Sequence, residues 1–139
     1  MKAYEYHHIV SFEETNLVGN VYYANYVRWQ GRCREMFLKD HAPDIIHDLS
    51  EGLALVTISV SCNYISELFA FDNVIIRMRL ANVKQNRMTM VFEYLRVTEQ
   101  GEELVAKGQQ QAACMLRKGD KTVPTPIPNS LKTALDKFI

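Results

Sequence analysis

The sequence predicts an α+β fold in a single domain of residues 1–139, with a curved antiparallel sheet wrapped around one long central helix. Large side chains recur at spacings of three and four residues, which places them on one helical face: Tyr22, Tyr26, Trp29, Cys33 and Phe37. After residue 52 the chain changes to long segments rich in Val, Ile and Leu, separated by short turns. Because a single helix with an aromatic face needs a concave surface to cover it, we expect the strands to curve around the helix.

The first half of the chain is expected to contain one strand and two helices. Residues 3–11 are rich in Tyr, His, Ile and Val, which favours a short first strand. The long helix is expected over about residues 21–39. It is broken before Pro43, because proline cannot continue a helix and restricts the residue before it. Residues 43–49 are expected to form a short second helix that ends before Gly52.

Four strands are expected in the second half, over residues 53–65, 71–84, 87–98 and 103–117. Short turns between long strands are typical of an antiparallel meander. The turn at residues 118–120 closes the last strand, and a proline-rich segment then leads to a terminal helix over residues 130–138. An exposed edge strand in such a sheet would favour pairing with a second subunit.

The composition excludes several classes of protein. Lys plus Arg and Asp plus Glu number 16 each, so the net charge predicts affinity for neither nucleic acid nor membranes. The N-terminus has no apolar signal core, and no run reaches membrane-spanning length, which predicts a cytoplasmic protein. Cys33, Cys62 and Cys114 are widely separated, so we expect small buried thiols rather than disulfides or a zinc site. No residue pattern indicates a metal or an organic cofactor.

A polar turn leads into the long helix and carries residue types that cap helices or allow tight backbone paths: Thr15, Asn16 and Gly19. At a helix start, unpaired backbone N–H groups and the positive end of the helix dipole lie together. Such a place can polarise a carbonyl group or hold an oxyanion. The alternative is an ordinary capped helix whose aromatic face is core.

From this turn the chain reads Thr15-Asn16-Leu-Val-Gly19-Asn-Val-Tyr22-Tyr23-Ala-Asn25-Tyr26-Val-Arg-Trp29. This run resembles the motif of the hotdog-fold acyl thioesterases of the 4-hydroxybenzoyl-CoA thioesterase type. In that motif an Asp-x-Asp element is followed by Gly and by an aromatic-Tyr-x-Asn-Tyr run that opens the helix. The match covers roughly residues 12–38, and it implies a hotdog domain that hydrolyses thioesters.

Within this family, residues 13–38 look most like the thioesterases of enediyne polyketide biosynthesis, a branch of antibiotic biosynthesis. The resemblance implies that the substrate is a polyketide chain, a β-keto polyene, tethered to the phosphopantetheine of an acyl carrier protein. It also implies a homo-oligomer, commonly a homotetramer built as a dimer of dimers. Asn16 stands where the broader family has its catalytic aspartate, and an amide cannot titrate in the useful range. The enediyne group resembles this sequence in lacking the acid.

The resemblance therefore implies catalysis by orientation and electrostatics. We expect the backbone N–H groups of Tyr22 and Tyr23 to receive the thioester carbonyl oxygen. Asn16 would position the attacking water or the thioester. Arg34, about three turns further along the helix, would supply positive charge for an anionic or enolic intermediate. Glu35 could substitute as the base if it faces the pocket, although an ion pair with a basic neighbour at helical spacing is the simpler account.

Residues near the turn and on the strands are expected to serve the substrate. Gly19 gives the tight turn, Asn25 is expected to hydrogen-bond a neighbouring loop, and Tyr26 is expected to pack against the sheet. An elongated polyene needs an apolar channel. Its expected lining comes from the strands: Val60, Cys62, Tyr64, Leu68 and Phe69.

The basic turn of residues 84–87, with Arg77 and Arg79 on the strand before it, could meet an acidic carrier protein or the pantetheine phosphate, although an ordinary solvated turn is the simpler account of these charges. Two other functions stay open. An acyl-CoA thioesterase of primary metabolism would keep the enzyme class, but Asn16 in place of the acid counts against it. A catalytically silent hotdog module that binds acyl chains or a carrier protein would also lack the acid.

Overall fold

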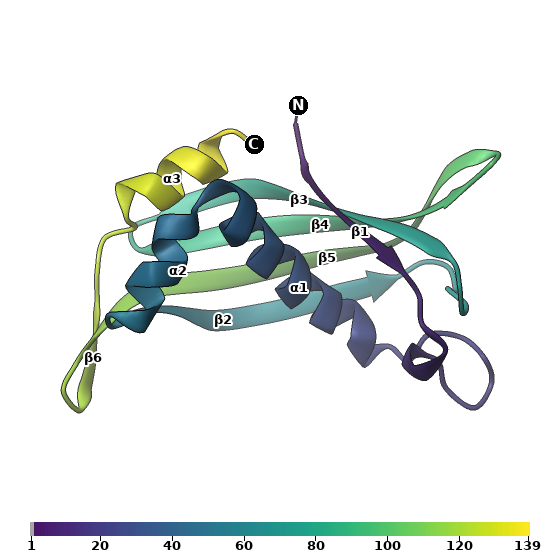
Figure 1. Cartoon of the computed structure of the whole chain (residues 1–139), viewed down its shortest axis with the longest axis horizontal. Helices are drawn as coiled ribbons and strands as arrows, with labels where there is room; N and C mark the ends of the chain where they lie inside the picture. Colours follow the sequence, from purple (N-terminus) through teal and green to yellow (C-terminus); the bar gives the residue numbers. More distant parts are fainter. Residues whose placement is uncertain (1) are drawn as a thin grey trace.

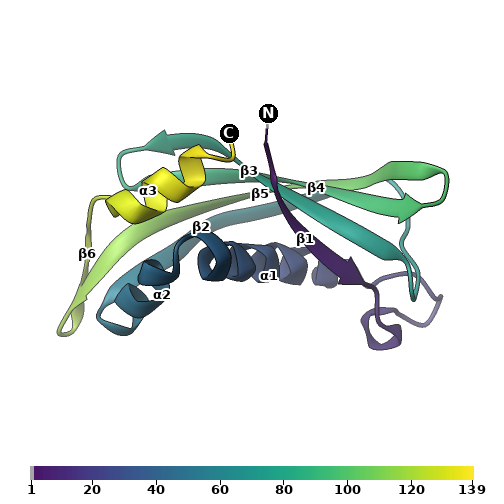
Figure 2. The ribbon, with the colours of Figure 1, turned by 45° about the horizontal axis from the view of Figure 1, so that its top comes forward.

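The protein is described by a computed structural model that covers residues 2–139. Its elements in chain order are β1 (Tyr4–Ile9), the 3-10 helix η1 (Phe12–Glu14), α1 (Ala24–His41), α2 (Pro43–Ser50), β2 (Leu53–Tyr64), β3 (Asn73–Lys84), β4 (Arg87–Thr98), β5 (Gly101–Lys118), β6 (Lys121–Pro124) and α3 (Asn129–Asp136). The sheet arches over α1, whereas α2 and α3 lie near the end of α1 that is remote from η1 (Figures 1 and 2). The predicted α+β arrangement, a curved antiparallel sheet around one long helix, is confirmed.

The helix α1 begins three residues later than the sequence pattern predicted. Two backbone N–H groups that the pattern assigned to the helix are paired elsewhere, since Val21 N donates to Leu68 O at 2.8 Å and Tyr22 N donates to Glu14 O at 2.9 Å. Tyr22 consequently precedes the helix and is 46% exposed, whereas the remaining members of the aromatic face are buried: Tyr26, Trp29, Cys33 and Phe37. Among the helices of residues 2–139, none is long and apolar enough to cross a membrane.

The sheet has the strand order β1-β3-β4-β5-β2, with β6 paired to β5, and every pair is antiparallel. The meander expected from the sequence is right for β3, β4 and β5 but wrong for β2, which lies beside β5. Residues 65–72 form a crossover instead of a tight hairpin, and their backbone is held by Val105 O and Val10 O. Strand β6 was not predicted from the sequence, because residues 118–120 turn the chain back onto β5 instead of ending the sheet.

The core lies between α1 and the concave face of the sheet. Its largest fully buried side chains include Tyr94 and Phe92 of β4, Ile76 and Met78 of β3, and Phe37 of α1. The cysteines are free thiols, as expected, with Cys33 and Cys114 buried and Cys62 half-buried. Burial raises the pKa of the Cys33 thiol to about 12 and that of Cys114 to about 11, so these thiols are unreactive packing groups.

Candidate active site

The carboxylate of Glu14 organises the turn in front of α1. Its Oε1 accepts a hydrogen bond from Ser11 N at 2.8 Å and lies 2.8 Å from His8 Nε2, while its Oε2 accepts from Trp29 Nε1 at 2.6 Å. Burial alone raises the pKa of Glu14, but the hydrogen bonds from Ser11, His8 and Trp29 outweigh it and hold the pKa below its usual value. Glu14 is therefore a fixed, ionised acceptor. The sequence signal for this role is the Ser-x-x-Glu spacing of a capping box, Ser11 to Glu14.

The backbone carbonyl of Glu14 determines which N–H group at the helix start is available. It accepts hydrogen bonds from Tyr22 N at 2.9 Å and from Asn25 Nδ2 at 2.8 Å. The N–H of Tyr22 is thus occupied, contrary to the expectation that it would receive a substrate carbonyl, while Asn25 makes the expected bond to the neighbouring loop. No acceptor for Tyr23 N is found among residues 2–139, and the Tyr23 carbonyl accepts from Tyr64 Oη at 2.8 Å.

Asn16 closes the turn with both its backbone and its side chain. Its carbonyl accepts from Gly19 N at 2.9 Å, its N–H donates to Asn20 O at 2.9 Å, and its Oδ1 accepts from Val18 N at 3.0 Å. Gly19 has a φ of +97°, in the left-handed region where glycine carries no Cβ penalty. Because Oδ1 is already engaged, the exposed side chain of Asn16 offers its Nδ2 group as a donor.

The crossover of residues 65–72 holds the other side of this turn. Asn20 and Phe69 form an isolated bridge, Val21 N donates to Leu68 O at 2.8 Å, and Asn20 Nδ2 donates to Glu67 Oε1 at 3.1 Å. Leu68 is fully buried, so it anchors the crossover in the core and does not line a channel. The position of the turn therefore depends on a segment about fifty residues away in the chain.

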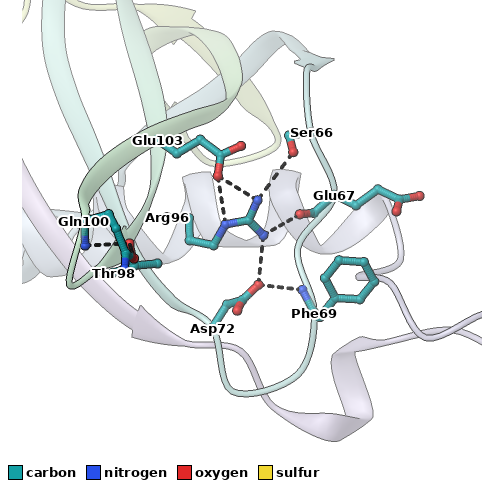
Figure 3. A network of polar contacts seen from close by, with 8 residues as sticks. All are labelled: Ser66, Glu67, Phe69, Asp72, Arg96, Thr98, Gln100 and Glu103. Atoms are coloured by element: carbon teal, nitrogen blue, oxygen red, sulfur yellow. Dashed lines mark hydrogen bonds and ion pairs between the residues drawn. The ribbon is translucent and has the colours of Figure 1, made fainter.

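Arg96 on β4 clamps the crossover to the sheet (Figure 3). Its Nη1 donates to Glu67 O at 2.7 Å and to Asp72 Oδ2 at 3.2 Å, and its Nη2 donates to Glu103 Oε1 at 2.8 Å and to Ser66 Oγ at 3.4 Å. Asp72 in turn accepts from Phe69 N at 2.8 Å. A single guanidinium thus joins β4, β5 and both ends of the crossover.

Three of the five expected substrate-channel residues are exposed, whereas Cys62 is half-buried and Leu68 is buried. Val60, Tyr64 and Phe69 are 37%, 47% and 44% exposed, on β2 or just after it. Tyr26, in contrast, is buried and packs edge-on against Tyr64, with ring centroids 4.8 Å apart. In one chain, therefore, Val60, Tyr64 and Phe69 form part of an exposed apolar surface, whereas Tyr26 packs against the sheet as expected.

Arg34 is half-buried and lies well away from the turn. Ten residues separate it from Ala24, a rise of about 15 Å along the helix axis at 1.5 Å per residue. Its Nη1 donates to Gln110 Oε1 on β5 at 2.8 Å, and no carboxylate of residues 2–139 forms an ion pair with it. The structure therefore does not bring Arg34 together with Asn16 or Tyr23 within one chain.

The guanidinium of Arg34 borders an apolar cavity of about 10 Å³, room for about one water molecule, between α1, the sheet and α3. Its lining includes side chains from three of these elements: Phe37 and Leu38, Met88 and Met90, and Leu131 and Leu135. Burial lowers the pKa of Arg34, but an arginine remains protonated at neutral pH. This cavity, with a cation at its edge, was not apparent from the sequence because its lining comes from residues nearly 100 positions apart.

The remaining charged candidates lie on outer surfaces. Glu35 pairs with Arg32 at 3.4 Å on the exposed face of α1, so the simpler account of this carboxylate is confirmed. Both residues line an outer groove of about 610 Å³ between β1 and α1. Arg77 pairs with Glu5 and Glu102, and Arg79 pairs with Glu93, so carboxylates compensate the charge of both arginines.

A second outer groove, of about 790 Å³, lies beside the β3–β4 turn. Its lining includes Gln85, Asn86 and Arg87 from this turn and Lys132 from α3. Residues 84–87 therefore remain an exposed basic turn, as the sequence indicated. No group of three or more potential metal-binding side chains occurs within the described part of the chain, residues 2–139.

Comparison with known proteins identifies the family. Residues 10–135 match the thioesterase-like superfamily. The dynemicin thioesterase, whose crystal structures reveal induced-fit and allosteric effects upon polyene binding, superposes with a TM-score of 0.95 at 45% identity, over 99% of this chain and 97% of that one. The 4-hydroxybenzoyl-CoA thioesterase of Pseudomonas sp. strain CBS-3 shares the fold, with a TM-score of 0.80 at 18% identity, over 96% of this chain and 99% of that one.

A curated protein of Aquifex aeolicus (strain VF5), named only provisionally as an esterase, is 30% identical over 121 residues, which are 87% of this chain and 90% of that protein. The family match covers most of the chain, and the curved sheet around α1 is the architecture that these structures share. The chain belongs to the thioesterase-like superfamily and is a thioester hydrolase with the hotdog fold.

Proposed function

We propose that the protein releases a polyketide acyl chain, a β-keto polyene, from the phosphopantetheine of an acyl carrier protein in enediyne-type biosynthesis, without a catalytic carboxylate. The observation that carries this proposal is the position of Arg34. Among residues 2–139 no carboxylate pairs with its half-buried guanidinium, so the positive charge is available to an anionic oxygen. An acyl group that bears an enolate or carboxylate oxygen would supply the missing partner of this cation. The 45% identity with the dynemicin thioesterase, a polyene-binding protein, supports this class of acyl group.

The proposed chemistry at the start of α1 uses hydrogen-bond donors in place of a catalytic carboxylic acid. The N–H of Tyr23, next to the positive end of the α1 dipole, would receive the thioester carbonyl oxygen. The Nδ2 group of Asn16 would orient the attacking water or the thioester. Water adds to the carbonyl carbon, the C–S bond breaks, and the phosphopantetheine thiol leaves with a proton as the carboxylic acid forms. The nearby carboxylates have other tasks, because Glu14 holds the turn and Glu35 pairs with Arg32.

Arg34 and the start of α1 are about 15 Å apart along the helix axis, so the proposal gives each of these two regions a separate role. In the proposal, Tyr23 and Asn16 act where the tethered thioester enters, and Arg34 supplies positive charge to an anionic or enolic oxygen of the acyl group. A β-keto acid product can then lose carbon dioxide, on the enzyme or after release.

The proposed assembly is a homo-oligomer, a dimer of dimers, in the cytoplasm. The edge strand β2 supports it, because residues 57–61 are exposed on both faces and three apolar side chains stand open on it: Val56, Ile58 and Val60. A second copy along this edge would cover the exposed surface that also carries Tyr64 and Phe69. The carrier protein is proposed to dock at the basic turn of residues 84–87.

The test is release of product from a carrier protein loaded with a conjugated polyene thioester, followed by mass spectrometry. We expect release by the wild type, a strong reduction in Arg34→Ala and a smaller one in Asn16→Ala. Lys39→Ala, which removes an exposed charge from the same helix, is the control and should retain the wild-type rate. The CoA ester of the same acid is run in parallel. Preference for the CoA ester would reject the carrier-protein substrate, and no release above the spontaneous rate would reject hydrolysis in favour of a binding module.

A further inference from the structure

Tyr6, His8 and Glu14 form a chain of polar side chains along the outer groove between β1 and α1. Tyr6 Oη lies 3.3 Å from His8 Nδ1, and His8 Nε2 lies 2.8 Å from Glu14 Oε1. Tyr6 and His8 are two residues apart on β1, so both side chains lie on the same side of the strand. All three residues line the groove of about 610 Å³. The phenol of Tyr6 is therefore next to an imidazole and accessible to a small molecule.

The charge of Glu14 decides which nitrogen of His8 carries the proton. Glu14 is ionised, and a carboxylate can only accept hydrogen bonds. His8 Nε2 is therefore the donor in the contact with Glu14, and Nδ1 of the neutral imidazole is an acceptor. The phenol of Tyr6 then donates to Nδ1. The network thus directs the proton of Tyr6 to a base whose other nitrogen is held by a carboxylate.

This arrangement has the parts of an activated nucleophile, which are a hydroxyl group, a base within reach of it and a third group that orients the base. Arg32 adds positive charge, since its pKa is raised chiefly by a hydrogen bond with Tyr6, and a guanidinium in this place stabilises a phenolate. The exposed Tyr22 lacks these parts. Its hydroxyl donates to Tyr23 Oη at 3.5 Å, and within residues 2–139 no imidazole or carboxylate accepts from it.

We propose that Tyr6 is a site of covalent acylation, which takes a short acyl group from an activated aryl ester bound in the outer groove. Charged and polar side chains make up most of the lining of this groove. Covering them with a long apolar chain would cost free energy, so the site favours a short acyl group. The modification is independent of the proposed function, because neither Tyr6 nor His8 takes part in the thioester chemistry.

The acylation step transfers one proton and exchanges one bond. Tyr6 Oη attacks the carbonyl carbon of the ester while its proton passes to His8 Nδ1. The bond between the carbonyl carbon and the aryl oxygen then breaks, and His8 gives the proton to the departing aryl oxide. The products are an O-acyl tyrosine and a phenol, and His8 is neutral again.

The test is treatment of the full-length protein with p-nitrophenyl acetate, followed by peptide mass spectrometry that locates and quantifies acetyl groups on tyrosines. We expect Tyr6 to be acetylated about tenfold or more faster than Tyr22 or Tyr23, because general-base assistance outweighs the greater exposure of these two side chains. Equal or faster acetylation of Tyr22 or Tyr23 would show that exposure alone sets the rate, and would overturn the inference.

His8→Asn removes the base and should slow the acetylation of Tyr6 about tenfold or more. His7→Asn is the matched control, because it makes the same change one position earlier, where the side chain is 69% exposed and points to the other side of β1. It should keep the wild-type rate. An unchanged rate in His8→Asn, or an equal loss in His7→Asn, would contradict the role of the imidazole.

In case His8→Asn does not fold, Arg32→Gln tests the site from an exposed position that the core does not depend on. Loss of the guanidinium should slow the acetylation of Tyr6 several-fold. Arg28→Gln, one helical turn earlier and on the same groove, is its control and should keep the wild-type rate. An unchanged rate in Arg32→Gln would count against the activated phenol, and equal losses in both variants would show that the rate follows overall charge instead.

Acetylation of Tyr6 and release from the carrier protein are measured separately. If the wild type hydrolyses the carrier-bound thioester but Tyr6 is not acetylated in preference to the exposed tyrosines, the inference is wrong and the proposed function stands. If Tyr6 is acetylated with the expected dependence on His8 but no carrier-bound thioester is hydrolysed, the proposed hydrolysis is wrong and the acylation site stands.

Discussion

The carboxylate of Glu14 accepts a hydrogen bond from the indole N–H of Trp29 at 2.6 Å, and this contact ties the turn before α1 to the second turn of the helix. The same carboxylate accepts from Ser11 N and lies 2.8 Å from His8 Nε2. Strand β1, the turn and the helix therefore meet at one half-buried charge. The orientation of the Tyr23 N–H, which follows this turn, depends on that junction.

We predict that Glu14→Gln destabilises the protein by about 1–3 kcal/mol, the usual range for a hydrogen-bonded group left without a proper partner. The amide has one acceptor atom, so it cannot accept from Ser11 N and Trp29 Nε1 at the same time on separate oxygens. Urea unfolding at a fixed protein concentration measures the change. Glu13→Gln, which alters an exposed neighbour, is the control, and an equal loss in both variants would contradict the role of Glu14.

The same pair of proteins should show a defined dependence on pH. The pKa of Glu14 is lowered in the folded state, so its stabilising contribution is present above its unfolded pKa of about 4.3 and is lost as the pH falls through the folded value. The difference in unfolding free energy between wild type and Glu14→Gln should therefore be constant near neutrality and shrink below about pH 4. A difference that does not change with pH would show that Glu14 is not ionised in the folded protein.

We predict that Gly108→Ala is destabilising because of Gln30. A Cβ at position 108 would overlap with Nε2 of Gln30, a fully buried side chain that donates to Ser61 O at 3.0 Å. Overpacking of this kind costs about 1–3 kcal/mol. The cost should largely disappear when Gln30→Ala is already present, which a double-mutant cycle of unfolding free energies detects. Gly31→Ala is the control, since nothing lies within 4 Å of its added Cβ, and additive effects at positions 108 and 30 would refute the clash.

We predict that Tyr64→Phe lowers the turnover number several-fold with little loss of stability. The hydroxyl of Tyr64 donates to the carbonyl of Tyr23 at 2.8 Å and so holds the residue whose N–H is proposed to receive the thioester carbonyl. Loss of one half-exposed hydrogen bond should cost about 1 kcal/mol or less of stability. Steady-state kinetics with the carrier-bound thioester measures the effect. Tyr6→Phe, which removes a hydroxyl in the outer groove, should retain the wild-type rate, and an unchanged turnover number in Tyr64→Phe would argue against Tyr23 as the donor.

Arg96→Met should loosen the turn that carries Asn16, although Arg96 does not contact it. Arg96 holds both ends of the crossover of residues 65–72, and Leu68 O in that crossover accepts from Val21 N. We therefore expect faster hydrogen exchange at the Val21 amide, at least tenfold, because local opening becomes less costly. Arg77→Met removes ion pairs elsewhere on the sheet and should leave this exchange rate unchanged. Equal rates in wild type and Arg96→Met would rule out the coupling.

The sequence was most informative where large side chains recur at helical spacing and the core buries them. Tyr26, Trp29, Cys33 and Phe37 share one helical face, so their spacing alone located α1. Tyr22 fits the same spacing but lies outside the helix, because its N–H donates a hydrogen bond to the carbonyl oxygen of Glu14. Spacing cannot report that competition, since the competing acceptor belongs to a separate turn.

The sequence alone determined the fold class, the thioesterase motif around Asn16 and the absence of an acid at that position, because each depends on local residue types and spacing. Only the tertiary structure decided that β2 lies beside β5, that within residues 2–139 the N–H of Tyr23 and not that of Tyr22 lacks an acceptor, and that Arg34 faces Gln110. Those features join residues up to 76 positions apart, and their geometry follows from how the helix packs into the curved sheet. The residue types that could take part in catalysis can therefore be read from short stretches of sequence, whereas the contacts between distant residues depend on how the whole chain packs.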